Sequence, residues 1–391
     1  MRPPPAPQLL LKKTGLKKLS WKSSKALPST SVSRRPAECS ALPEPQKIVP
    51  LRAVGPVRPT PRNRRSARER SRETDSRTIM GNGPTNGARS YTMKMADRSA
   101  LVAFPLVVLI GCGVAVAGSQ GGASVHGIPV FALSVGLVFL IQWLVFIPAY
   151  LLQSEGFFDI TGSITYIAVT AIAVLLGPVA DGRSILLLAL VVIWAARLGA
   201  YLFRRIRKAG KDARFDEIKP SFIRFFNTWT LQGLWVSLTL AAALAAITTT
   251  VRKDLGVVAL LGSLVWAAGF AVEAAADVQK SRFRADPANR GRFIRSGLWS
   301  WSRHPNYFGE IVLWIGVAVI ALPVLRGWQW VTLISPLFVI LLLTRVSGVP
   351  LLEKKANATW GGQDDYEAYK ARTAVLVPRP PARAPTRGGR G

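Results

Sequence analysis

The sequence predicts an all-α polytopic membrane protein with about eight transmembrane helices and a disordered basic N-terminal leader. Three observations lead to this prediction. Hydrophobic residues make up 49% of the 391-residue chain, and most of them lie in long apolar stretches between residues 99 and 350. Residues 1–95 are instead rich in Pro, Arg, Ser and Lys. With eight spans, every strongly basic loop falls on the same side of the membrane.

A hydrocarbon core about 30 Å thick requires about 20 apolar residues in a helix. Backbone groups facing lipid must satisfy their own hydrogen bonds, so these stretches should be helical. The expected spans are residues 100–118, 128–152, 163–180, 184–203, 229–250, 255–275, 307–325 and 329–347. We therefore expect a membrane domain over 96–391, with a cofactor-binding half at about 250–380.

The leader, residues 1–95, contains too little apolar surface to fold, so we expect disorder. Three interpretations remain open. Translation could start at Met93 or Met95. The leader could be a polybasic arm on anionic lipid or, by composition alone, nucleic acid. It could also be an organellar targeting segment. We expect no nucleic-acid partner for the membrane domain.

The distribution of Lys and Arg among the loops predicts on which side of the membrane the termini lie. Segments 204–224 and 280–303 are strongly basic, whereas the loops on the other side carry few Lys or Arg residues. The positive-inside rule then puts both termini in the cytoplasm. Only two Cys and two His occur, so no disulfide framework and no metal site are expected. The pattern excludes a soluble globular enzyme, and the oligomeric state stays open.

The stretch most informative about chemistry is 273–311. Glu273, Asp277 and Lys280 recur at helical spacing and share a face. Glu273 is expected about one turn inside the hydrocarbon. An ionisable group there is energetically costly, so its presence favours a functional role. The alternative is a salt bridge among these three residues at the membrane edge.

A loop rich in arginine follows. Its guanidinium groups suit phosphate, although basic loops also simply fix topology. The arginines are Arg282, Arg284, Arg290, Arg292 and Arg295. Asn289, Gly291 and Gly297 punctuate this loop, which predicts an ordered turn.

Residues 302–310 then read Ser-Arg-His-Pro-Asn-Tyr-Phe-Gly-Glu. Pro305 suits the first turn of a helix, where its missing N–H costs nothing. His304 and the free N–H groups of that turn predict an anion site. His304, Tyr307 and Glu310 follow at steps of three, so one face carries a His, a Tyr and a Glu.

This string, with Gly297-Leu298-Trp299 before it, resembles the steroid 5α-reductase-like membrane superfamily and most closely the bacterial domain of unknown function 1295. The resemblance covers about residues 100–380 and is strongest over 270–378. It implies an enzyme of a bacterial inner membrane that holds a nucleotide cofactor in its C-terminal half. Asp277, Lys280, Arg292, Arg303, His304, Asn306 and Arg345 are then expected to bind the cofactor, and Tyr307 and Glu310 to be catalytic.

The superfamily also contains sterol reductases and isoprenylcysteine carboxyl methyltransferases. The methyltransferases carry a similar Arg-His-Pro-x-Tyr-x-Gly string and bind S-adenosylmethionine, and Glu353, Tyr366 and Tyr369 resemble their tail. NADPH carries several phosphate charges, whereas S-adenosylmethionine has a cationic sulfonium. The many arginines therefore favour NADPH.

Two further candidate catalytic residues are acids that lie outside the 273–311 stretch. Glu155 and Asp159 follow the second span on the cytoplasmic side, and either could be a proton donor. The alternative is an interfacial loop. Arg197 lies within the fourth span, so we expect it to have a partner or to extend to the interface.

We expect NADPH-dependent reduction of a carbon–carbon double bond in an apolar, steroid- or lipid-like substrate. The alternatives are an S-adenosylmethionine-dependent membrane methyltransferase and a non-enzymatic transporter.

Overall fold

The computed structural model describes residues 86–209 and 215–380, with side chains over 95–207 and 215–380, all within one compact unit, Gly81–Gly391. The predicted disordered leader lies outside the described residues up to residue 85. Its last part differs from the prediction, because the first described helix already begins at Asn86. The apolar run of this helix continues from Leu101, and helix formation extends back from it into the polar segment.

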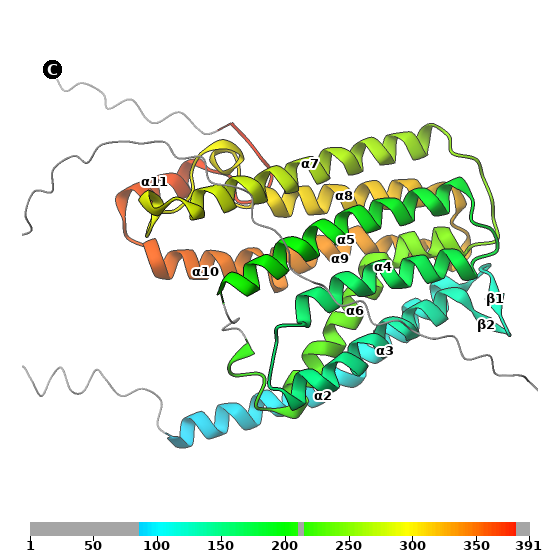
Figure 1. The fold of residues 1–391 in the computed structure, drawn as a ribbon, viewed down its shortest axis with the longest axis horizontal. Coiled ribbons are helices and arrows are strands. Elements are labelled where there is room, and N and C mark those ends of the chain that lie inside the picture. The colour runs from blue at the N-terminus through cyan, green and yellow to red at the C-terminus, as the bar shows by residue number, and fades with distance from the viewer. Residues whose placement is uncertain (1–85, 210–214, 381–391) are drawn as a thin grey trace, which may run out of the picture. The chain divides into compact units, whose positions relative to one another are not determined.

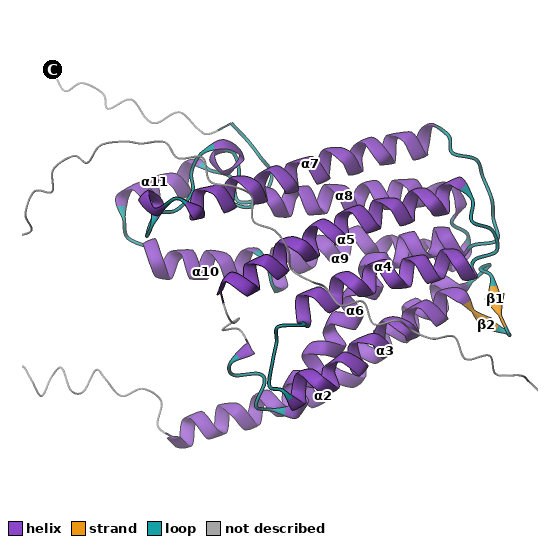
Figure 2. Ribbon diagram, viewed as in Figure 1, coloured by secondary structure: helices purple, strands orange, loops and turns teal. Residues whose placement is uncertain are grey.

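Long helices lie side by side, with one two-stranded hairpin at one end (Figures 1 and 2). In chain order the elements are α2 (Asn86–Ser119), β1 (Ser124–Val125), β2 (Ile128–Pro129), α3 (Val130–Leu151), α4 (Phe158–Leu176), α5 (Gly182–Ala209), α6 (Phe222–Thr248), α7 (Val257–Ala285), α8 (Pro305–Ala321), α9 (Ile334–Leu341), α10 (Val349–Trp360) and α11 (Asp364–Arg372). Short 3-10 turns lie at Pro287–Asn289, Gly297–Ser300, Leu322–Val324 and Gly327–Leu333.

Eight segments of the described residues are long and apolar enough to cross a bilayer, as the sequence predicted. They are Met95–Ser119, Val130–Leu151, Phe158–Leu176, Gly182–Arg207, Phe222–Thr248, Val257–Ala285, Pro305–Val324 and Gly327–Trp360. The chain is an integral membrane protein of the all-α class. Most spans extend beyond the apolar stretch that identified them, because polar residues continue the helix into the interface.

Helix α6 lies at the centre of the bundle. Its second half, residues 238–248, is fully buried and rich in alanine. Small side chains allow neighbouring helices to approach closely, which is how membrane helices pack without a hydrophobic driving force. Helices α2, α3, α4, α8 and α9 all contact α6.

Helices α7 and α8 form the most extensive pair in the bundle. Gly269 and Gly309 face each other across this pair. A Cβ atom on Gly309 would lie 2.5 Å from the backbone nitrogen of Glu273, and one on Gly269 would lie 2.5 Å from that of Leu313. Only glycine permits so close an approach. The seam therefore fixes where the polar residues of α7 stand relative to the start of α8.

The eighth span is irregular, whereas one regular helix over 329–347 was expected. It consists of a 3-10 segment, helix α9, a π-helical turn at Leu342–Val346, and then α10. Pro336 and Pro350 lack the backbone N–H that a continuous helix would use. Pro350 lies in the first turn of α10, so a new helix begins there.

Candidate functional site

The site is built at the end of the bundle where α5 and α7 finish and α6 and α8 begin, which we call the basic end (Figure 1). Pro305 is the first residue of α8, as predicted. The loop between α7 and α8 is ordered, also as predicted. Gly291 and Gly297 adopt positive φ angles of 75° and 60°, and the Leu298 N–H donates to Gln279 of α7 over 3.0 Å.

The C-terminal segment closes over this loop. The Arg303 N–H donates to the Ala374 carbonyl over 2.8 Å, and the Tyr369 hydroxyl donates to the Trp299 carbonyl over 2.7 Å. Trp299 is buried and donates its indole N–H to the Ala276 carbonyl over 3.1 Å. Residues from α7, the loop and the tail are thus bonded into one unit.

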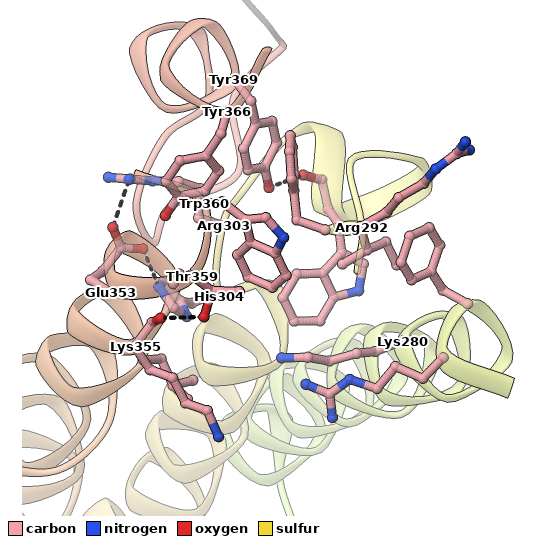
Figure 3. A pocket seen from close by; sticks show the side chains of 17 residues that line it. Lys280, Arg292, Arg303, His304, Glu353, Lys355, Thr359, Trp360, Tyr366 and Tyr369 are labelled. Carbon is pink, nitrogen blue, oxygen red and sulfur yellow. Dashed lines mark hydrogen bonds and ion pairs between the residues drawn. The ribbon is translucent and has the colours of Figure 1, made fainter. Parts of the chain in front are cut away.

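A cavity with several basic side chains in its lining lies within this unit, and we call it the basic cavity (Figure 3). Its volume is about 220 Å³. Its charged lining residues are Lys280, Arg284, Arg292, Arg303, Glu353 and Lys355, and its ring-bearing residues are Phe283, Phe293, Trp299, His304, Trp360, Tyr366 and Tyr369. Cations outnumber the one acid among the described residues that line it, and aromatic faces separate them. Such a lining suits a ligand with both phosphate groups and a flat ring.

Lys280 points into the basic cavity in Figure 3, with its Nζ 4.3 Å from the centre of the Trp299 ring. Arg284 follows one turn later on the same face of α7 and also lines the cavity. Arg292 lies at the rim, where its exposed side chain extends outward (Figure 3). The cations therefore stand at different depths, from the rim to the inside of the bundle.

Glu353 of α10 joins two of the predicted residues. It accepts from Arg303 over 2.7 Å, and its other oxygen lies 2.8 Å from His304 Nε2 (Figure 3). Burial lowers the pKa of His304 below its ordinary value, although the neighbouring Glu353 carboxylate acts in the opposite direction. The neutral ring then donates from Nε2, which leaves Nδ1 as an acceptor. Nδ1 is buried and has no hydrogen-bond partner among the described residues.

Beneath the cavity lies an acid cluster of Glu273, Asp277 and Glu310. Arg197 of α5 donates to Glu273 and, over 2.9 Å, to Asp277. The expected partner for Arg197 is therefore present. The alternative interpretation, a salt bridge of the two α7 acids with Lys280, differs from what is found, because both acids pair with Arg197 and Lys280 faces Trp299.

Glu310 completes the acid cluster from α8. It forms no hydrogen bond or ion pair with another described residue, but it lies close enough to Asp277 and Arg197 to interact with their charges. Asn306 stands one turn earlier beside Asp277, and its Oδ1 atom is buried without a partner. Tyr307 packs its ring on His304, with 5.7 Å between ring centres. Residues predicted to bind the cofactor and residues predicted to be catalytic thus lie together at the start of α8.

Seven predicted residues do not line the basic cavity. Asp277, Asn306, Tyr307 and Glu310 lie in the acid cluster or at the start of α8, whereas the other three lie elsewhere. Glu155 is buried in an ion pair with Lys219, and Asp159 lies 3.4 Å from Arg205 of α5. Arg345 is exposed on the π-helical turn. These pairs join the α3–α4 loop and the first turn of α4 to Lys219 and Arg205, which favours the interfacial interpretation for both acids.

Some lining residues were not singled out from the sequence as cofactor ligands, chiefly Arg284, Lys355 and Trp360. Arg284 could have been found, because it follows Lys280 by four residues on one helix face. Lys355 and Trp360 carried no such signal, since the course of the chain after the irregular eighth span could not be foreseen. Among the described residues, no group of three His, Cys, Asp or Glu side chains is arranged to hold a metal ion.

Comparison with known proteins agrees with the resemblance. A protein-family model described as "Protein of unknown function (DUF1295)" matches residues 145–373. These residues include the third to eighth spans, the arginine-rich loop and both tyrosines of the tail. No curated protein and no solved structure gave a significant match. The match covers more than half of the chain, which therefore belongs to the DUF1295 family.

Proposed function

We propose that this membrane protein is an NADPH-dependent reductase of a carbon–carbon double bond in an apolar, lipid-like substrate. One observation carries the proposal. A cavity lined by five cationic side chains and several aromatic rings lies next to a buried cluster of carboxyl groups. Lys280, in the cavity lining, is one helical turn from Asp277 in the cluster.

The cavity lining fits the nucleotide part of the cofactor. Lys280, Arg284 and Arg303 offer charge to phosphate oxygens, and Trp299 and Trp360 offer ring faces for a base. The unpartnered Nδ1 atom of His304 can accept from a ribose hydroxyl. A cavity of about 220 Å³ suits one nucleoside with its phosphates rather than a whole dinucleotide. The reactive end would then lie toward Asn306.

NADPH supplies a hydride when it is bound, and the remaining work belongs to the chain. The double bond takes up that hydride on one carbon and a proton on the other, leaving NADP⁺. The unpartnered Oδ1 of Asn306 can accept from the carboxamide of the nicotinamide and orient the ring. Glu310 is the acid of the cluster without an ion-pair partner, so we assign the proton to it rather than to Glu155 or Asp159. Arg197 holds the other two acids in place.

The orientation follows from charge. The basic end, with Arg204, Arg205 and the α7–α8 loop, would face the cytoplasm of a bacterial cell, where NADPH is available. The apolar substrate would enter from the bilayer.

Methyl transfer from S-adenosylmethionine is the second candidate. Phe293, Trp360, Tyr366 and Tyr369 form a contiguous ring cluster beside Glu353, and such a cluster can surround a sulfonium. The excess of cations in the same lining opposes a cationic ligand. We therefore place the reductase first.

The test is ligand-dependent thermal stability of the detergent-purified chain. A ligand that binds only the folded state raises the apparent melting temperature. We expect a rise with NADPH and none with S-adenosylmethionine. Lys280→Gln should weaken NADPH binding at least about tenfold, because a hydrogen bond to a charged group contributes about 1.5–3 kcal/mol. Lys354→Gln is the matched control, since Lys354 is exposed on α10 and does not line the cavity.

A rise with S-adenosylmethionine alone would favour methyl transfer. A chain that responds to neither ligand would contradict both enzyme proposals and leave transport. A reductase further requires oxidation of NADPH at 340 nm in the presence of an unsaturated lipid, and Glu310→Gln should abolish that oxidation while NADPH still binds.

A further inference from the structure

A second cavity opens between α5 and α7 at the basic end, on the other side of α7 from most of the basic cavity. Its volume is about 510 Å³. Arginine dominates its lining, through Arg197, Arg204, Arg205, Arg282 and Arg284, together with Tyr201 and Asp277. We call it the arginine cavity.

Most of this positive charge is not neutralised by the protein. Arg197 is paired with the acid cluster, and Arg205 lies 3.4 Å from Asp159. Arg204, Arg282 and Arg284 form no ion pair or hydrogen bond with any residue that the structure describes. Arg284 also lines the basic cavity, so Arg204 and Arg282 are the two unpaired guanidinium groups that belong to this hollow alone among the described lining residues. Guanidinium is the side chain best suited to carboxylate and phosphate, because its planar fork can donate two parallel hydrogen bonds.

The hollow lies between two helices that do not close on each other. Helix α7 packs closely on α8, and α5 packs closely on α4, but α5 and α7 do not pack closely on each other. The side chain of Arg197 bridges them instead. Apolar residues face outward along both helices below the arginines, for example Ile193 on α5 and Leu264 on α7, which are 48% and 58% exposed. A long apolar chain could lie against this surface.

The positive-inside rule explains why this end has many arginines, but it places no condition on their arrangement. Arg290 shows the difference, because it is exposed in the α7–α8 loop and lines neither cavity described here. Arg204 and Arg282 come from two helices about 80 residues apart in the chain and line the same hollow. Its lining also includes Asp277, which belongs to the acid cluster, and Arg197, which donates to that cluster.

We propose that the arginine cavity is a lateral portal for an amphiphile with an anionic head group, a carboxylate or a phosphate. The arginines bind the head, the apolar chain remains in the bilayer along α5 and α7, and the head stands beside the acid cluster. This inference rests on the proposed function for its consequence, which is that the reduced substrate is an acidic unsaturated lipid. The binding itself can be tested without cofactor.

The experiment measures lipid binding to the purified chain by native mass spectrometry. Three probes share oleoyl chains and differ in the head group: oleate, dioleoyl phosphatidic acid and dioleoyl phosphatidylcholine. We expect the two acidic lipids to bind more tightly than the zwitterionic one. The double variant Arg204→Gln/Arg282→Gln should bind them about 25-fold less tightly, since each basic residue near an anionic surface contributes a factor of about five.

The double variant Arg290→Gln/Lys354→Gln removes the same charge from surfaces outside the two cavities and should change binding less than about twofold. Arg204→Lys/Arg282→Lys keeps the charge and should retain most of the affinity, which also guards against misfolding of the Gln variant. Preference for oleate or for phosphatidic acid identifies the head group. Equal affinity for acidic and zwitterionic lipids, or equal losses in the Gln variant and its control, would overturn the proposal.

NADPH binding to the same variants separates this inference from the proposed function, because Arg204 and Arg282 do not line the basic cavity. Loss of lipid binding with NADPH binding retained supports both. Lipid binding by a chain that does not respond to NADPH would retain the portal and overturn the reductase.

Discussion

Replacement of Gly309 by alanine tests whether the close α7–α8 seam holds the site together. The added Cβ would lie 2.5 Å from the Glu273 backbone nitrogen and 2.6 Å from the Gly269 carbonyl oxygen. Ordinary contact begins near 3.4 Å, so the two helices must separate by 0.9 Å, the difference between 3.4 and 2.5 Å. Overpacking of this kind costs about 1–3 kcal/mol. Both neighbours are backbone atoms, so no side-chain rotation can relieve the clash.

Gly136→Ala is the matched control. Gly136 also lies inside a membrane helix, α3, but a Cβ there would meet nothing within 4 Å. Both variants share the gain in helix propensity, about 1 kcal/mol, so the difference between them isolates the strain. At about 2–4 °C per kcal/mol, Gly309→Ala should melt roughly 2–12 °C below Gly136→Ala.

The assay is thermal unfolding in detergent followed by tryptophan fluorescence, with NADPH binding measured in parallel. Separation of α7 from α8 also moves Glu273 and Asp277 away from Asn306 and Glu310. NADPH affinity should therefore fall together with stability. If Gly309→Ala and Gly136→Ala melted within about 1 °C of each other, the seam would not be the rigid reference that positions the site.

Three further predictions concern single contacts. Arg197→Gln should destabilise the fold, because it leaves two buried carboxylates without their cation. The loss should stay below about 3–5 kcal/mol, the cost of breaking a fully buried pair, because the Arg197 side chain is 20% exposed and water screens part of its charge. Arg197→Lys should recover part of this loss in the same unfolding assay. The lowered pKa of His304 means that the unfolded chain takes up a proton at a higher pH than the folded chain does. The contribution of His304 to the free energy of unfolding is therefore fully present above about pH 6.5. Below that pH it falls by at most about 1.4 kcal/mol per pH unit until the folded-state pKa is reached. Urea titrations should find this slope in the wild type and in His126→Gln but not in His304→Gln. Tyr369→Phe should cost about 1–3 kcal/mol, because the buried Trp299 carbonyl loses its 2.7 Å hydrogen bond, and the melting temperature measures this directly.

The number of spans was predictable because it depends on local properties. Each span contains enough consecutive apolar residues to cross the bilayer. The ordered α7–α8 loop was predictable for a similar reason, since Gly291 and Gly297 occupy positive φ angles. The irregular eighth span was missed because hydropathy is insensitive to whether a segment forms 3-10, α or π hydrogen bonds.

The candidate site was predictable only in part. Its residues on α7 and at the start of α8 lie within one short stretch, where helical spacing shows which of them share a face. Partners from elsewhere in the chain could not be found in this way. Arg197 was expected to need a partner because buried charge is costly, but which acid it meets depends on how α5 approaches α7. Lys219 beside Glu155 and Glu353 beside His304 depend on tertiary packing alone.

The bond between the Arg303 N–H and the Ala374 carbonyl has a consequence for biosynthesis. Residue 374 leaves the ribosome long after α7 and α8 have entered the membrane. Until then, Trp299 lacks the Tyr369 hydroxyl and the basic cavity lacks one wall. A nascent chain with all eight spans inserted would therefore still have an incomplete basic cavity, and any ligand of this cavity would be captured only after the segment that follows α11 has folded back onto the loop.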